Sequence, residues 1–263
     1  MTRITRLFDR LKAEGRTGMI AYLTAGDPTP EATPGLVAAL ERGGADLIEL
    51  GVPFSDPIAD GPVIQQAGDR AIKAGTTLRR VLEMAAKIRT TSEIPLLLFT
   101  YLNPALRYGF AKLAQDAKAA GIDGCLLTDV SVEEAEEYVS VMRAAGLDTV
   151  FLAAPTSTEE RLALVARYSS GFIYLVSRTG ITGEQTSIAD SAMPLVERMR
   201  RHTDLPLAMG FGISTPAHVE AFNGKVEGIV VGSAVVRQIE RDPAQLEAFM
   251  ANLTSPLRVA AIL

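Results

Sequence analysis

The stretch GADLIEL at residues 44–50 recurs as GIDGCLL at 121–127 and as GLDTVFL at 146–152. Each copy has glycine, an apolar residue, aspartate, one further residue and an apolar run. The second and third copies follow alanine-rich segments with the composition of a helix. Glycine ends a helix well because it adopts the left-handed backbone conformation needed at the C′ position. The pattern therefore predicts a helix, a stop and a short buried strand, used repeatedly along the chain.

The same template predicts about eight strands. They are expected at residues 19–24, 47–51, 95–101, 125–129, 149–154, 172–177, 206–211 and 228–232. Most are continuous apolar runs, as in parallel strands covered on both faces, and each precedes a helical pattern. Such alternation over about 250 residues predicts a closed (β/α)8 TIM barrel, formed by residues 1–263 as one domain. The main alternative is an open doubly wound sheet, but no G-x-G-x-x-G motif follows the first strand.

Several helix starts are also marked in the sequence. Two pairs have the spacing of a capping box: Ser131 with Glu134, and Ser157 with Glu160. Thr215 before Pro216 predicts an N-cap followed by proline at the first helical position.

An extra helix is expected before the first strand, in MTRITRLFDRLKAEG at residues 1–15. Four apolar residues recur there at helical spacing: Ile4, Leu7, Phe8 and Leu11. Asp9, Glu14 and the lack of an apolar core in this stretch argue against a targeting peptide. No apolar run approaches the length of a membrane span, so we expect a cytoplasmic protein.

The composition limits the classes of function. A formal net charge of −5 argues against a nucleic-acid surface, so an anionic substrate would need a local positive field. The single cysteine, Cys125, lies in an apolar run and is interpreted as a buried hydrophobic residue. His202 and His218 are the only histidines, which excludes a His-rich metal site.

A carboxylate, Glu49, interrupts the apolar strand in DLIELGVPFSDPIADGP at residues 46–62. Strand residues alternate in direction, so Ile48 and Leu50 should face the helices and Glu49 the barrel interior, near its catalytic mouth. Gly51, on the same side, is expected to leave space for a ligand. Apolar surroundings raise the pKa of a carboxyl, which suits proton transfer. The alternative is a structural Glu paired with an Arg.

Asp60 follows in the loop after this strand, as does Asp56. Taken alone, each is an ordinary turn aspartate. Beside Glu49, a solvated loop carboxylate would have a different pKa, and the two groups could divide acid–base catalysis from charge stabilisation.

The last two strands carry a phosphate-binding signal. GFG at residues 210–212 ends the seventh predicted strand, and GSA at 232–234 ends the eighth and begins a helix. Barrels commonly bind phosphate there, with backbone N–H groups and a helix N-terminus. SRTGITGEQTS at 177–187 is polar and long for its place, and is interpreted either as a surface loop or as a lid over the substrate.

These stretches resemble, in order and over nearly the whole chain, signatures of the tryptophan synthase alpha chain family. The matching stretches are AYLTAGDP at 21–28, LIELGVPFSDPIADGP at 47–62, YLVSRTGITG at 174–183, GFGIS at 210–214 and GSAVV at 232–236. The resemblance implies a lyase of tryptophan biosynthesis that cleaves indole-3-glycerol phosphate to indole and glyceraldehyde 3-phosphate. It implies a retro-aldol reaction without metal or organic cofactor.

The resemblance also implies the roles of single residues. Glu49 falls on the family's general acid–base, and Asp60 on the carboxylate near the indole N–H. The remaining positions are substrate-binding: Tyr22 at the indole pocket, Tyr174 close to Glu49, Thr182 in the lid, and Gly183, Phe211, Gly212, Gly232 and Ser233 at the phosphate. Ser131 departs from the family, in which proline is expected at this place.

The family further implies a partner, a β subunit that carries pyridoxal phosphate and forms an α2β2 complex with the alpha chain. Asp56, Asn103 and Pro104 fall in the contact region. Two alternatives are a stand-alone indole-releasing lyase and a catalytically silent subunit that activates a partner. The loop with Asp56 disfavours the first, and the presence of Glu49 and Asp60 disfavours the second.

Overall fold

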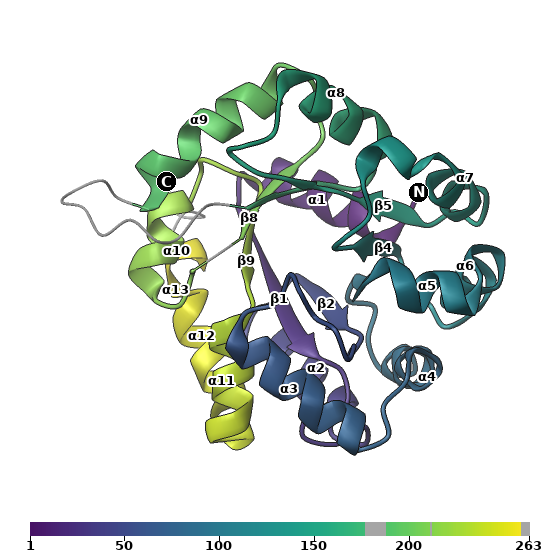
Figure 1. Ribbon diagram of the computed structural model, residues 1–263. Helices are drawn as coiled ribbons and strands as arrows, with labels where there is room; N and C mark the ends of the chain where they lie inside the picture. The colour runs from purple at the N-terminus through teal and green to yellow at the C-terminus, as the bar shows by residue number, and fades with distance from the viewer. Residues whose placement is uncertain (177–187, 211, 259–263) are drawn as a thin grey trace.

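A ring of parallel strands surrounded by helices forms a (β/α)8 barrel in the computed structural model, which describes residues 1–176, 188–210 and 212–258 (Figure 1). The strands are β1 (Gly18–Thr24), β2 (Leu47–Gly51), β3 (Leu96–Thr100), β4 (Gly124–Leu127), β5 (Asp148–Val150), β6 (Leu152–Ala153), β7 (Ile173–Val176), β8 (Leu207–Gly210) and β9 (Gly228–Val231). The predicted TIM barrel is therefore confirmed.

The helices cover the outside of this ring and one of its ends. They are α1 (Arg3–Glu14), α2 (Thr33–Arg42), α3 (Pro62–Lys73), α4 (Leu78–Ile88), α5 (Leu102–Tyr108), α6 (Phe110–Ala119), α7 (Glu136–Ala144), α8 (Glu159–Tyr168), α9 (Ile188–Arg200), α10 (Pro216–Phe222), α11 (Ser233–Arg241), α12 (Leu246–Leu253) and α13 (Ser255–Arg258). Two 3-10 turns are η1 (Val132–Glu134) and η2 (Pro243–Gln245). None of the described helices is long and apolar enough to cross a membrane.

The barrel closes through the strand expected at residues 149–154, which is divided at Phe151 into β5 and β6. β5 pairs with β4, whereas β6 pairs with β7. One predicted strand thus becomes two, because its two halves hydrogen-bond to different neighbours. The other seven expected strands are present, within one or two residues of their predicted ends.

The glycines of the repeated pattern end helices, as predicted. Gly44, Gly121 and Gly146 have φ angles of 102°, 81° and 70°, in the left-handed region that residues with a Cβ rarely adopt. Cys125, in the second copy, is buried, and burial raises the pKa of its thiol to about 12.

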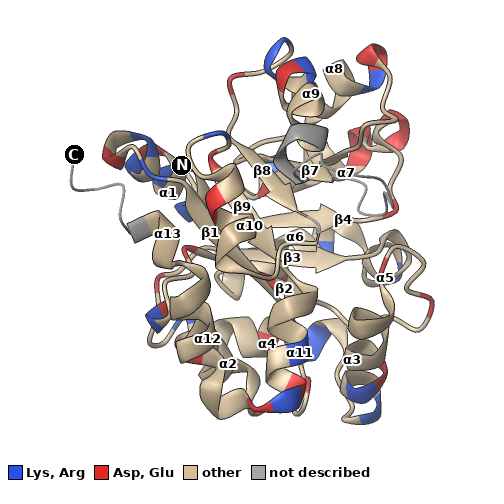
Figure 2. Ribbon diagram, turned by 90° about the vertical axis from the view of Figure 1, so that its left-hand side faces the viewer, with Lys and Arg blue, Asp and Glu red and all other residues tan. Residues whose placement is uncertain are grey.

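Helix α1 closes the N-terminal end of the barrel, opposite the end that bears α5 (Figure 2). Its apolar face packs on inward-facing residues in the strands or directly before them: Ile20, Leu47, Leu97, Leu126, Val150, Phe172, Ala208 and Val230. The rings of Phe8 and Phe172 lie 5.6 Å apart. The extra N-terminal helix is thus confirmed, and it fills the end of the barrel that lies away from the strand C-termini.

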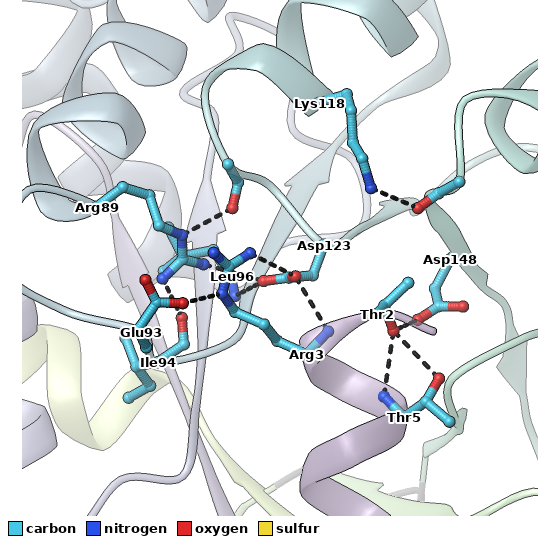
Figure 3. Close-up of polar contacts among 12 residues, drawn as sticks. Thr2, Arg3, Thr5, Arg89, Glu93, Ile94, Leu96, Lys118, Asp123 and Asp148 are labelled. Carbon is cyan, nitrogen blue, oxygen red and sulfur yellow. Dashed lines mark hydrogen bonds and ion pairs between the residues drawn. The ribbon is translucent and has the colours of Figure 1, made fainter.

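Two aspartates of the repeated pattern, Asp123 and Asp148, hold this helix in place (Figure 3). Asp123 accepts hydrogen bonds from Arg3 Nη1 at 3.2 Å, from Arg89 Nη2 at 2.9 Å and from the N–H of Leu96 at 3.0 Å. Asp148 accepts one from the hydroxyl of Thr2, the N-cap residue of α1.

Asp46, in the first copy, secures the turn between α1 and β1. It accepts two hydrogen bonds from Arg16, at 2.9 and 2.7 Å, and one from the N–H of Met19 at 2.8 Å. The repeated pattern therefore supplies carboxylates at three strand starts: two bind the start of α1, and the third binds the turn that follows this helix.

Replacing Asp123 with asparagine is expected to lower the free energy of unfolding by about 3–5 kcal/mol, because the Arg89 guanidinium would be left buried without its carboxylate. Urea unfolding measures this loss. Glu93→Gln is the matched control: it removes the other carboxylate on Arg3, which is exposed, and should leave the midpoint nearly unchanged. Equal losses of stability in the two variants would contradict this role of Asp123.

Two of the three predicted helix caps are wrong. The hydroxyl of Ser131 donates to the carboxylate of Glu133 and makes no capping bond, because the chain first forms η1 and α7 begins only at Glu136. At α8 the cap is Thr158, whose Oγ1 accepts from the N–H of Arg161 at 3.3 Å.

Ser157, expected as that cap, instead accepts a hydrogen bond from the N–H of Ala154 at 3.1 Å and closes the preceding turn. The third expectation is confirmed, since Thr215 caps α10 ahead of Pro216.

Candidate active site

Strand alternation puts Glu49 inside the barrel. Leu47 packs with the interior cluster beneath α1, whereas Ile48 and Leu50 pack in the layer between strands and helices. Glu49 shares the side of Leu47 and lies two residues closer to the C-terminal end of β2. The exposed fraction of Glu49 is 1%, so its carboxyl is buried in the barrel interior, toward the C-terminal ends of the strands.

Within the described residues, neither carboxyl oxygen of Glu49 has a hydrogen-bond partner, and no ion pair reaches it. Burial raises its pKa to about 8. A buried carboxyl without a partner is expected to hold its proton at neutral pH. In the described part of the chain, the alternative of a structural Glu–Arg pair has no support.

Two tyrosines lie beside Glu49. Tyr22 is its cross-strand partner on β1, and its ring packs edge-on against Phe99 with centroids 5.2 Å apart. Tyr174, on β7, lies near enough that the charge of Glu49 adds to the effect of burial in raising the tyrosine's pKa. The residues expected at Glu49 and at the indole pocket are therefore together in the structure.

The expectation that Gly51 leaves space for a ligand is wrong. A Cβ placed on Gly51 would lie 2.2 Å from Oη of Tyr22, so the missing side chain makes room for the tyrosine. Gly210, at the end of β8, does the same for Tyr174, with 2.4 Å to its hydroxyl oxygen. Sequence reasoning could not assign these pairs, because each joins residues from different strands.

Asp60 lies half-buried in loop 52–61, between β2 and α3. Burial raises the pKa of its carboxyl, and a hydrogen bond from Tyr101 acts in the opposite direction. The charges of Asp60 and Glu49 both raise the pKa of Tyr22, after the larger effect of burial. Both carboxyl groups thus lie near Tyr22, and within the described part of the chain only Asp60 has a hydrogen-bond donor.

The segments expected to bind phosphate lie at the end of the barrel where Glu49 and Tyr22 are found. Gly232 lies beside Tyr22, since a Cβ built there would be 3.7 Å from Cβ of that residue. Ser233 begins α11, and the N–H groups of a first helical turn have no partner within the helix. Gly212 follows β8 with a φ of 72°. The structure does not describe Phe211 or segment 177–187, which includes Thr182 and Gly183 and is expected from the sequence to be a surface loop or a lid.

A separate cavity of about 520 Å³ lies at the opposite end of the barrel, next to α1. It is lined by Phe8, Asp148 and the turn before β8, so it is remote from Glu49. Among the described residues, no three His, Cys, Asp or Glu side chains come together as a metal site.

Comparison with known proteins places this arrangement in a family. A family model described as tryptophan synthase alpha chain matches residues 8–260. The chain belongs to the tryptophan synthase alpha chain family. The predicted resemblance is confirmed, and with it the assignment as a lyase of the alpha reaction in tryptophan biosynthesis.

Relatives and solved structures agree over almost the whole length. The tryptophan synthase alpha chain of Solibacter usitatus is 68% identical over 260 residues, covering 98% of this chain and 97% of that protein. The crystal structure of the tryptophan synthase alpha subunit from Legionella pneumophila has a TM-score of 0.89 at 35% identity, covering 98% of this chain and 99% of the other. A structure of Mycobacterium tuberculosis tryptophan synthase has a TM-score of 0.90 at 34% identity, covering 98% and 99%.

The raised pKa of Glu49 predicts a stability effect that depends on pH. Between the ordinary glutamate pKa and about 8, the unfolded chain loses a proton that the folded chain keeps, so stability falls as the pH rises. Glu49→Gln removes this loss. From pH 5.5 to pH 8 the stability of the variant relative to the unsubstituted protein should rise by about 3 kcal/mol.

Urea unfolding of both proteins at the two pH values measures this difference. Glu137→Gln, an exposed change on α7, should show no such pH dependence. A constant difference between the Glu49 variant and the unsubstituted protein would mean that Glu49 is not held protonated by burial.

Proposed function

We propose that Glu49 and Asp60 perform the cleavage of indole-3-glycerol phosphate in this chain, and that Glu49 is the proton donor and acceptor. The observation that carries the proposal is the burial of Glu49 among apolar and aromatic side chains without a hydrogen-bond partner in the described chain. A carboxyl in such surroundings is protonated near neutral pH, and it can give up and regain a proton at that pH.

The first step transfers the proton of Glu49 to C3 of the indole ring. This leaves a positive charge on the indole nitrogen, which the nearby carboxylate of Asp60 stabilises. The hydrogen bond from Tyr101 favours the ionised form of Asp60. The two carboxyl groups thus have different surroundings, because Glu49 is buried without a hydrogen-bond partner in the described chain and Asp60 has a donor in Tyr101.

In the second step the Glu49 carboxylate takes the proton of the hydroxyl on the carbon attached to C3. The bond between that carbon and C3 breaks, its electron pair returns to the ring, and the carbon becomes the aldehyde of glyceraldehyde 3-phosphate. One proton is given and one regained, so Glu49 ends in its starting state. These steps are proton transfers and one C–C cleavage, and they call for no cofactor on this chain.

The phosphate is proposed to bind at Gly212, Gly232 and Ser233, together with Gly183 and Phe211, which lie outside the described residues. The N-terminus of α11 supplies N–H groups and the positive end of a helix dipole. Gly232 and Tyr22 are neighbours, so a phosphate at α11 would place the rest of the substrate over Tyr22 and Glu49. Thr182 is proposed to act from the lid.

The proposed partner is a β subunit carrying pyridoxal phosphate, bound in an α2β2 complex at Asp56, Asn103 and Pro104. Asp56 and Asn103 are exposed. Two large apolar residues nearby in sequence are also exposed: Ile58 at 83% and Leu106 at 53%. Exposed apolar side chains of this size favour a docking surface. The cytoplasmic location stays a prediction.

The test mixes the protein with indole-3-glycerol phosphate and assays indole, with and without a tryptophan synthase β subunit. Indole release by the chain alone that rises when the β subunit is added supports the proposal. No release in either condition would favour the silent subunit. Release that is unchanged by the β subunit, together with failure to co-purify, would favour a stand-alone lyase.

A further inference from the structure

Tyr101, which no catalytic or substrate-binding prediction included, contacts loop 52–61 at two points. It lies directly after β3, is the residue that precedes α5, and is 2% exposed. Its ring packs on Phe54 with centroids 5.1 Å apart. Its hydroxyl accepts a hydrogen bond from the backbone N–H of Ala59 at 3.1 Å. Tyr101 therefore joins the end of β3 to both parts of the loop that carries Asp60.

The same hydroxyl interacts with the Asp60 carboxylate. Burial and the charge of Asp60 both raise the pKa of Tyr101, so the phenol keeps its proton and can donate it. Its hydrogen bond lowers the pKa of Asp60, opposing the effect of burial. One hydroxyl thus accepts from the backbone beside Asp60 and lies near enough to the Asp60 carboxylate to lower its pKa.

A second residue also contacts this loop, but it binds only the backbone. Gln65, on α3, donates to the backbone carbonyl of Asp60 at 2.8 Å and to that of Pro57 at 3.3 Å. Gln65 is exposed and these two bonds are to the backbone only. Among the described residues, Tyr101 is the side chain that acts on the Asp60 carboxylate, and the ring of Tyr101 is held in place by burial and by Phe54.

We propose that Tyr101 is a positioning residue for the reaction, which holds the Asp60 carboxylate at the place where positive charge develops on the indole nitrogen. The inference rests on the proposed role of Asp60 and extends it. Tyr101 touches neither reacting carbon in this scheme and acts only through its neighbour. Its two contacts with the loop lower the freedom of Asp60 before substrate binds, which is how a fixed charge contributes to catalysis.

The test is a double-mutant cycle on the full chain with Tyr101→Phe, Asp60→Asn and the double variant, with indole release measured in each. Tyr101→Phe keeps the ring on Phe54 and removes one oxygen. It should lower kcat about tenfold, the loss expected for one hydrogen bond to a charged group. In the Asp60→Asn background the same change should have no further effect, because the group through which Tyr101 acts is gone.

The pH profile gives a second readout that a purely structural role would not move. The titratable groups around Asp60 are Tyr101 from the end of β3 and Tyr22 from β1, and Tyr22 also senses Glu49. Without the Tyr101 hydroxyl the pKa of Asp60 should rise. The acid limb of the kcat profile should therefore move to higher pH in Tyr101→Phe.

Tyr138→Phe is the matched control, since that tyrosine is also buried and its hydroxyl donates to the carbonyl of Cys125 at 2.9 Å, away from the site. It should lower Tm without shifting the profile. The inference is overturned if Tyr101→Phe has normal kcat, or lowers activity equally with and without Asp60. Full activity of Asp60→Asn alone would instead show that the proposed role of Asp60 is wrong, and the inference would fail with it.

Discussion

Replacing Glu49 with glutamine is expected to lower kcat for indole release by about 10³-fold, within the range for loss of a general acid–base group. Glutamine has the same shape as a protonated glutamic acid, so the packing around Tyr22 and Tyr174 should persist. It cannot give a proton to C3 or take one from the hydroxyl. KM should change little, because the carboxyl acts on charge that develops after binding.

Steady-state kinetics on indole-3-glycerol phosphate measure this loss, and circular dichroism checks that the fold is retained. Glu137→Gln on the outer helix α7 is the control for a Glu to Gln change, and it should keep full activity. Near-normal turnover of the Glu49 variant would refute the acid–base assignment. The stability of the same variant relative to the unsubstituted protein should rise toward pH 8, so a loss of activity and a pH-dependent gain in relative stability are predicted together.

Replacing Asp60 with asparagine is expected to lower kcat by about 10²-fold, as on removal of one group that stabilises transition-state charge. The amide carries no charge to balance the indole nitrogen after C3 is protonated. The indole ring is neutral in the bound substrate, so KM should stay within a few-fold of its original value. The loss of activity should therefore appear as a lower kcat.

Asp69→Asn is the matched control, since Asp69 is exposed on α3, the helix that follows the same loop. Its kinetics should not change. If Asp60→Asn raised KM and left kcat alone, Asp60 would bind the substrate in its ground state and would not stabilise the positive charge. That outcome would leave the role of Glu49 intact.

Much of the architecture follows from local rules. The repeated glycines predict helix ends, because the left-handed conformation at Gly121 is a property of one residue and its neighbours. The direction of Glu49 follows from the two-residue period of a strand, once Ile48 and Leu50 are assigned to the helix layer. The spacing of Ile4, Leu7, Phe8 and Leu11 likewise gives α1, although not what it covers.

Gly51 and Tyr101 are used by partners distant in the chain, whereas the two wrong caps, Ser131 and Ser157, lose their hydroxyls to residues two and three positions away. From the local sequence, Gly51 is expected to leave space for a ligand, yet the ring of Tyr22 from β1 fills that space. Ser157 has the spacing of a cap, yet its hydroxyl closes the turn at Ala154. Tyr101 reads as one more apolar residue at a strand end, and its bonds to Ala59 and Asp60 depend on how loop 52–61 folds back over β3.

By itself, the sequence determined the barrel, the N-terminal helix and the inward direction of Glu49, because backbone conformation and side-chain alternation depend on residues close together in the chain. Only the tertiary structure decided that two strand-start aspartates bind the start of α1 and a third binds the turn after it, that Tyr22 lies near two unlike carboxyl groups, and that Tyr101 contacts the loop that carries one of them. The reason is physical: burial and hydrogen bonding between distant segments set the pKa and position of a group, and no spacing along the chain encodes them.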